Sequence, residues 1–126
     1  PVSNPDVVVV VDPTLIESID VTEGAKDDAK FIINSSKEAA ELRKKLNLKP
    51  TQKLYVLDAT KIAIDCFGRP MPNSPMVGAL NKVTGLVNLE TLLEDVKKSF
   101  GKKFSQKIID GNLLAVKRGY EEVKEG

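Results

Sequence analysis

The amino-acid sequence predicts an α/β fold: a three-layer arrangement of a mainly parallel sheet with helices on both faces, followed by a helical carboxyl-terminal region. The first half of the sequence repeats the order of apolar strand, polar turn and helix three times, which is typical of right-handed βαβ crossovers. The second half holds helical patterns only. Since 126 residues suffice for one hydrophobic core and not for two, a single domain over residues 1–126 is expected.

The first βα unit begins with an unbroken run of valine. Val7–Val11 is β-branched throughout and is flanked by polar residues, which predicts a strand buried on both faces. Thr14 and Glu17 then have the spacing of a capping box, which predicts a short helix over residues 15–18.

The second unit has the same order. Phe31–Ile33 predicts a strand, and Ser35 with Glu38 forms another capping box. A helix is therefore expected over residues 37–46.

The third unit has the strongest signals at both ends of its helix. Residues 54–57 predict a strand that ends at Asp58, and a helix is expected over residues 59–67. Gly68 follows at the position where a left-handed cap ends a helix.

Three further helices are expected in the second half. Ser74 is expected to cap the first, with Pro75 at its first position and Gly85 at its end. Asn88 is expected to cap the second, whose apolar stripe reaches Phe100.

The last helix is expected over residues 105–124, with apolar residues at near-heptad spacing. Gly111 and Gly119 are expected to weaken it, each by about 1 kcal/mol relative to alanine in an exposed interior.

Composition excludes several classes of function. The net charge of +1 gives no reason to expect nucleic acid or a membrane as partner, and the longest apolar run is only strand-sized. The single cysteine excludes an intrachain disulfide framework, and no signal peptide is recognisable, so a cytoplasmic location is expected. With no histidine the chain has no ordinary general base near neutral pH and few options for zinc. No catalytic residue and no metal ligand are expected.

Polar residues follow all three predicted strands, where open α/β sheets bind ligands. They are Asp12, residues 34–36 and Asp58. This set could hold a metal, a phosphorylatable aspartate or a nucleotide, although no phosphate-binding glycine loop accompanies it. The favoured interpretation is that these side chains cap the helices behind them.

Two other features have a structural and a functional interpretation. Cys66 lies on an apolar helix stripe, so a core position is favoured over a nucleophile. Gly78 within a helix indicates close approach of another backbone, either inside this domain or from a partner, and both remain open. A solvated helix end is favoured over an anion site for a basic cluster that comprises Lys97, Lys98, Lys102, Lys103 and Lys107.

Three stretches carry a resemblance to a known family. Residues 5–15 resemble a strand and turn of the gamma subunit of pyruvate and related 2-oxoacid:ferredoxin oxidoreductases. Residues 58–63, followed by 68–70 and 73–80, look like that family's most recognisable block, and Asn112 with residues 118–121 is similar to its closing helix. Together they cover nearly the whole chain in the expected order.

The resemblance implies the gamma component of an enzyme that converts a 2-oxoacid, with pyruvate expected first, to acyl-coenzyme A and passes the electrons to ferredoxin. It also implies that other subunits bind the thiamine diphosphate, magnesium and iron–sulfur clusters, in agreement with a chain whose one cysteine cannot ligate a cluster. Coenzyme A would be a substrate, and ferredoxin an indirect partner. The expected contacts with the other subunits are Asn73, Met76, Gly78 and Asn112.

One departure from the family concerns the amino-terminal end. The family's gamma subunit starts with a glycine-rich segment of the His-Gly-x-Gly-Gly-Gln-Gly kind, which this sequence lacks. The chain therefore resembles the carboxyl-terminal two-thirds of that subunit, and we expect the first βα unit to be missing. Two alternatives are a free-standing nucleotide- or anion-binding α/β module and an interaction domain without a ligand.

Overall fold

The computed structural model describes residues 7–12, 14, 22, 25–68, 72–85, 87–100 and 104–126, in two compact units. Unit 1 comprises Pro1–Leu57 together with Lys124–Gly126, and unit 2 comprises Asp58–Val123. The predicted helix over residues 15–18 lies outside the described residues.

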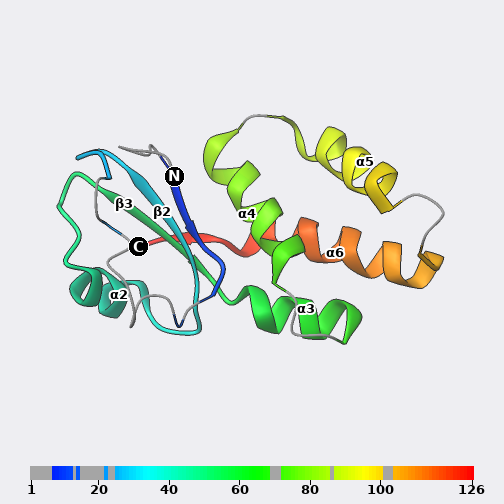
Figure 1. The fold of residues 1–126 in the computed structure, drawn as a ribbon, viewed down its shortest axis with the longest axis horizontal. Coiled ribbons are helices and arrows are strands. Elements are labelled where there is room, and N and C mark those ends of the chain that lie inside the picture. The colour runs from blue at the N-terminus through cyan, green and yellow to red at the C-terminus, as the bar shows by residue number, and fades with distance from the viewer. Residues whose placement is uncertain are drawn as a thin grey trace. The chain divides into compact units, whose positions relative to one another are not determined.

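Unit 1 is built around a four-stranded sheet of order β1-β2-β3-β4 (Figure 1). β1 (Val7–Val10), β2 (Lys30–Asn34) and β3 (Lys53–Leu57) are parallel, and β4 (Lys124–Glu125) runs antiparallel to β3. These strands confirm the predicted α/β class and the mainly parallel sheet.

The core of unit 1 lies between one face of the sheet and helix α2 (Ala39–Leu46). Because side chains alternate along a strand, every second strand residue reaches this core. Its buried members are Val10, Ala29, Phe31, Ile33, Leu42 and Leu54.

The predicted burial of the first strand on both faces is wrong at one position. Val10 packs in the core, whereas Val9 points to the opposite face and is 37% exposed. Among the described residues β1 is paired only with β2, so it has the environment of an edge strand rather than of a central one.

The start of α2 also differs from the prediction. The Ser35 hydroxyl accepts a hydrogen bond from the Lys37 amide at 3.1 Å and closes a turn before the helix. The helix begins at Ala39, with Glu38 in the N-cap position and without a side-chain cap. The capping box of Ser35 and Glu38 is therefore wrong, because a local serine turn competes for the same hydroxyl.

Unit 2 consists of helices α3 (Ala59–Phe67), α4 (Asn73–Thr84), α5 (Leu89–Phe100) and α6 (Gln106–Glu122). α6 packs against the other three (Figure 1). The predicted helical carboxyl-terminal region is confirmed.

Most helix ends in unit 2 match their sequence signals. Asp58 and Asn88 accept hydrogen bonds from the amides of Lys61 and Thr91, as N-caps do. Gly68 and Gly85 both have positive φ and end α3 and α4, as predicted.

The start of α4 and the end of α6 are corrections. α4 begins at Asn73 with Pro72 as its N-cap, so Ser74 does not cap it and Pro75 is its third residue. α6 ends at Glu122 because Val123 adopts an extended conformation and leads into β4. A two-residue strand has no pattern of its own in the sequence.

Three glycines let the helices of unit 2 approach one another closely. A Cβ atom at Gly78 would overlap the carbonyl oxygen of Val116, and one at Gly119 would overlap that of Pro75. At Gly111 a Cβ atom would lie 2.9 Å from the Cys66 carbonyl oxygen. The view of Gly111 and Gly119 as weak points in an exposed helix is thus wrong, since both are buried contact points.

Candidate functional site

The polar residues that follow the strands are engaged in local structure. The Asp12 carboxylate accepts hydrogen bonds from the Thr14 hydroxyl and amide, and these bonds hold its pKa below the usual value. Asn34 donates to the Val11 carbonyl oxygen at 2.9 Å, and Asp58 caps α3. For Asp58 the predicted capping role is confirmed. Within the described residues no three histidine, cysteine or acidic side chains cluster as metal ligands would.

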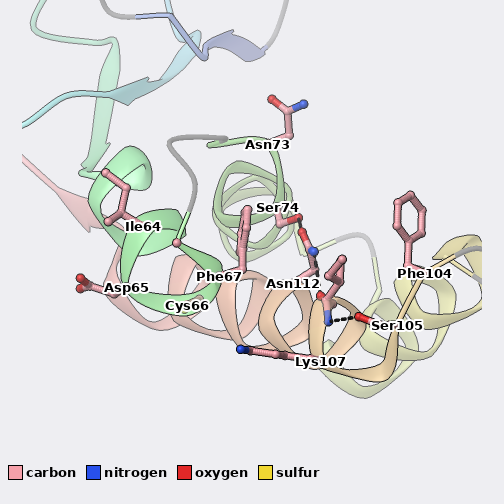
Figure 2. A pocket seen from close by; sticks show the side chains of 12 residues that line it. Ile64, Asp65, Cys66, Phe67, Asn73, Ser74, Phe104, Ser105, Lys107 and Asn112 are labelled. Atoms are coloured by element: carbon pink, nitrogen blue, oxygen red, sulfur yellow. Dashed lines mark hydrogen bonds between the residues drawn. The ribbon is translucent and has the colours of Figure 1, made fainter.

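A half-open groove in unit 2 is the more prominent candidate site, with a volume of about 1030 Å³ (Figure 2). It is formed by the end of α3, the start of α4 and the start of α6. Its lining residues are Ile64, Asp65, Cys66, Phe67, Gly68, Asn73, Ser74, Phe104, Ser105, Lys107, Ile108 and Asn112.

A polar pair, the half-buried Ser74 and the buried Asn112, forms part of the wall of this groove. The Ser74 hydroxyl donates a 2.7 Å hydrogen bond to Oδ1 of Asn112, and Nδ2 of Asn112 donates to the Ile108 carbonyl oxygen at 2.9 Å. Asn112 is only 8% exposed. The pair connects the first turn of α4 to α6 in the wall of the groove.

Three of the large apolar side chains that line the groove are exposed. Ile64 is 49% exposed, Phe104 46% and Ile108 39%. Figure 2 shows Ile64 on α3 and Phe104 ahead of α6 at separate ends of the groove.

Of the two basic side chains near the groove, one is paired with two carboxylates and the other has no ion pair among the described residues. Arg118 lies 3.4 Å from Oδ2 of Asp65 and forms two hydrogen bonds with the Glu122 carboxylate, which raise the pKa of the guanidinium. A guanidinium nitrogen of Arg118 also lies 3.9 Å from Sγ of Cys66, which is a free, half-buried thiol. Lys107 is exposed and forms no ion pair with any described residue.

The four predicted interface residues all lie in unit 2, and two of them line the groove. Asn73 is exposed at its edge, and Asn112 lies in its wall. Met76 and Gly78 are buried, and the contact of Gly78 with Val116 bears out the alternative of helix packing inside this chain.

The sequence interpretation missed Phe104 and Ile108. Phe104 follows two lysines in a short polar connection, and Ile108 adjoins the predicted apolar stripe without belonging to it. An aromatic residue in a connection between helices was the available signal.

No helix in the described part of the chain has the length and apolar character needed to cross a membrane.

Comparison with known proteins gives a consistent set of relatives. The sequence model of the family described as "Pyruvate ferredoxin/flavodoxin oxidoreductase" matches residues 1–122. "Pyruvate synthase subunit PorC" of Thermotoga maritima is 48% identical over 123 residues, which are 98% of this chain and 62% of the relative. "Pyruvate/ketoisovalerate oxidoreductases common subunit gamma" of Pyrococcus furiosus is 41% identical over 120 residues, 95% of this chain and 62% of the relative.

The fold agrees with a solved structure. The crystal structure of the pyruvate oxidoreductase subunit PORC of Thermotoga maritima matches with a TM-score of 0.87 and 45% identity, over 99% of this chain and 67% of the other. The chain spans about three-fifths of the length of the two curated relatives named above. It belongs to the pyruvate ferredoxin/flavodoxin oxidoreductase family, within the group of gamma, or PorC, subunits.

Proposed function

We propose that this chain is part of the gamma component of a 2-oxoacid:ferredoxin oxidoreductase. In this role it supports the oxidative decarboxylation of a 2-oxoacid to an acyl-coenzyme A, with transfer of the electrons to ferredoxin. The observation that carries the proposal is the match of the family across residues 1–122 together with relatives whose names describe gamma or PorC subunits.

Pyruvate is the proposed 2-oxoacid. The names of both the Thermotoga and the Pyrococcus relatives include pyruvate. The Pyrococcus name describes a subunit common to pyruvate and ketoisovalerate enzymes. A subunit shared by two enzymes cannot by itself distinguish their substrates, so we assign the choice of 2-oxoacid to other subunits.

The cofactors are proposed to lie in those other subunits. The chain has one cysteine and no histidine, whereas an iron–sulfur cluster is generally held by four cysteine thiolates. Thiamine diphosphate and its magnesium ion are therefore expected in partner subunits, with coenzyme A as a substrate of the assembled enzyme. A cytoplasmic location is part of the same proposal, because it suits a chain without cysteine pairs.

The proposed contact with the partner subunits involves the edge of the groove. Asn73 is exposed there and can face a partner directly. Asn112, Met76 and Gly78 are buried behind it and hold the first turns of α4 against α6, so their contribution to an interface is to fix its shape.

Purification of the full-length protein under native conditions tests the proposal. A tag on this chain should retain other subunits together with iron and thiamine diphosphate. The retained material should reduce ferredoxin in a reaction that needs both coenzyme A and a 2-oxoacid, fastest with pyruvate. A colourless protein without partners, particularly one that binds a nucleotide, would favour the alternative of a free-standing module.

A further inference from the structure

The groove of unit 2 gathers exposed apolar surface that the chain itself does not cover in its described part. Single exposed apolar residues are ordinary, but a group of them in one depression marks an interaction site. Ile64, Phe104 and Ile108 line one depression, together with the half-buried Phe67. The Ser74–Asn112 hydrogen bond connects α4 to α6 in the wall behind them.

The unpaired charge at the groove is the positive charge of Lys107. Lys107 lies in the first turn of α6, where the helix dipole already presents positive charge and where a cation is unfavourable. That turn contains no acidic residue, and Lys107 has no ionic partner among the described residues. Asp65, the acidic residue in the described lining, shares Arg118 with Glu122, so the unpaired positive charge is local to Lys107.

A second helix adds to this charge. α4 begins beside the same groove, with Asn73 and Ser74 in its first turn. It has neither a side-chain cap nor an acidic residue in that turn. The positive ends of two helices and the Lys107 ammonium group therefore lie at one apolar depression. An acidic group from outside the chain would stabilise all three.

We propose that this groove docks a segment of another subunit of the oxidoreductase, in which apolar side chains stand beside at least one carboxylate. The apolar side chains cover Ile64, Phe104 and Ile108, and the carboxylate pairs with Lys107 at the start of α6. This inference rests on the proposed function, because it requires a partner subunit. A second copy of this chain is a poorer occupant, because the unpaired Lys107 ammonium groups of two facing grooves would repel each other.

A photo-crosslinking residue in the groove identifies the occupant directly. p-Benzoylphenylalanine at position 104 of the full-length protein, in the assembled complex, should crosslink to another subunit on illumination. Mass spectrometry should place the crosslink in a segment with Asp or Glu close to apolar residues. Val77 on α4 is 40% exposed and does not line the groove, so the same probe there is the matched control. If the variant at position 104 does not assemble, position 108 takes the probe.

Charge reversal tests the ionic part of the proposal. Lys107→Glu should weaken association of the subunit with the complex by roughly tenfold, and Lys107→Arg should preserve it. A carboxylate in the first turn favours a helix, so Lys107→Glu is not expected to disrupt α6 itself. Lys117→Glu reverses another exposed lysine of α6 outside the groove, and it should leave association unchanged.

The outcomes separate this inference from the proposed function. If the unmodified protein retains no partner subunit, the proposed function fails. If partners are retained but position 104 crosslinks to nothing, only to a second copy of the chain or only to another part of its own chain, the docking site is overturned. The same conclusion follows if Lys107→Glu and Lys117→Glu associate equally well.

Discussion

Individual residues decide how closely α4 and α6 pack. Gly78 and Gly119 each face the backbone of the other helix, where a Cβ atom has no space. A glycine inside a helix indicates a reason for its presence, and at Gly78 that reason was predictable as close backbone approach. The partner was not predictable, because a single sequence does not reveal which helix lies opposite. For Gly119 the low helix propensity of glycine predicted a weak point, which was wrong because that rule applies to an exposed helix and Gly119 is buried.

Replacement of Gly119 by alanine should destabilise the protein by about 3 kcal/mol, because the new methyl group meets the Pro75 carbonyl oxygen in a packed interface. Gly85→Ala is the matched control. A Cβ atom at position 85 would meet no neighbouring atom, and only the positive φ disfavours alanine there, so the loss of stability should be about 1 to 2 kcal/mol. Denaturant unfolding measures both changes. Equal losses of stability in the two variants would show that the contact between α4 and α6 can accept a methyl group at position 119.

Variants of Asp58 distinguish a helix-capping role from a role in catalysis. Its carboxylate accepts a hydrogen bond from the Lys61 amide at 3.1 Å. Asp58→Ala should therefore cost about 1 kcal/mol of stability, whereas Asp58→Asn should retain the cap. Activity of the assembled enzyme should survive in both variants. A loss of activity in a stable Asp58→Asn protein would show that the carboxylate takes part in chemistry.

At the scale of elements, the quality of the local signals determined how well each one was predicted. α3 was predicted with its correct bounds because Asp58 caps one end and Gly68, with positive φ, closes the other. α4 was displaced because Ser74 bonds to Asn112, a residue distant in sequence, instead of to its own helix. β4 was missed because a strand of two residues has no sequence pattern of its own and is defined only by its pairing with β3. In both cases a partner from elsewhere in the chain overrides the local rules: the Asn112 side chain for α4 and the backbone of β3 for β4.

The docking of β4 on β3 should depend on pH. Partial burial raises the pKa of Tyr55 above its usual value, and the charge of Glu125 and a hydrogen bond with it act in the same direction. The unfolded chain then loses the tyrosine proton at lower pH than the folded chain. Stability from this group is complete below about pH 10 and is lost as the pH rises above that value.

Tyr55→Phe should reduce this dependence. The free energy of unfolding of the unmodified protein should fall more steeply between pH 9 and pH 11 than that of the Tyr55→Phe variant, a range set by the usual tyrosine pKa of about 10. Tyr120→Phe removes the other tyrosine and should leave the Tyr55 contribution intact. Identical pH profiles for the unmodified protein and Tyr55→Phe would contradict the effect assigned to burial and Glu125.

At the scale of the whole molecule, the sequence was informative about class and family but not about the groove. The strand–helix order and three family stretches indicated an α/β gamma subunit, and the family match extends over residues 1–122. The groove joins residues from α3, α4 and α6 that are spread between positions 64 and 112 of the chain, so no local pattern marks it. Its exposed apolar side chains become visible only when the helices are packed.

Immunodepletion tests the central claim most directly. An antibody against this chain should remove from a native cell extract the coenzyme A-dependent reduction of ferredoxin by at least one 2-oxoacid, pyruvate first, in proportion to the chain removed. An antibody of unrelated specificity should leave that activity in place. If the chain is removed completely while the reduction of ferredoxin by every 2-oxoacid tested stays at its original rate, the chain is not a component of such an enzyme.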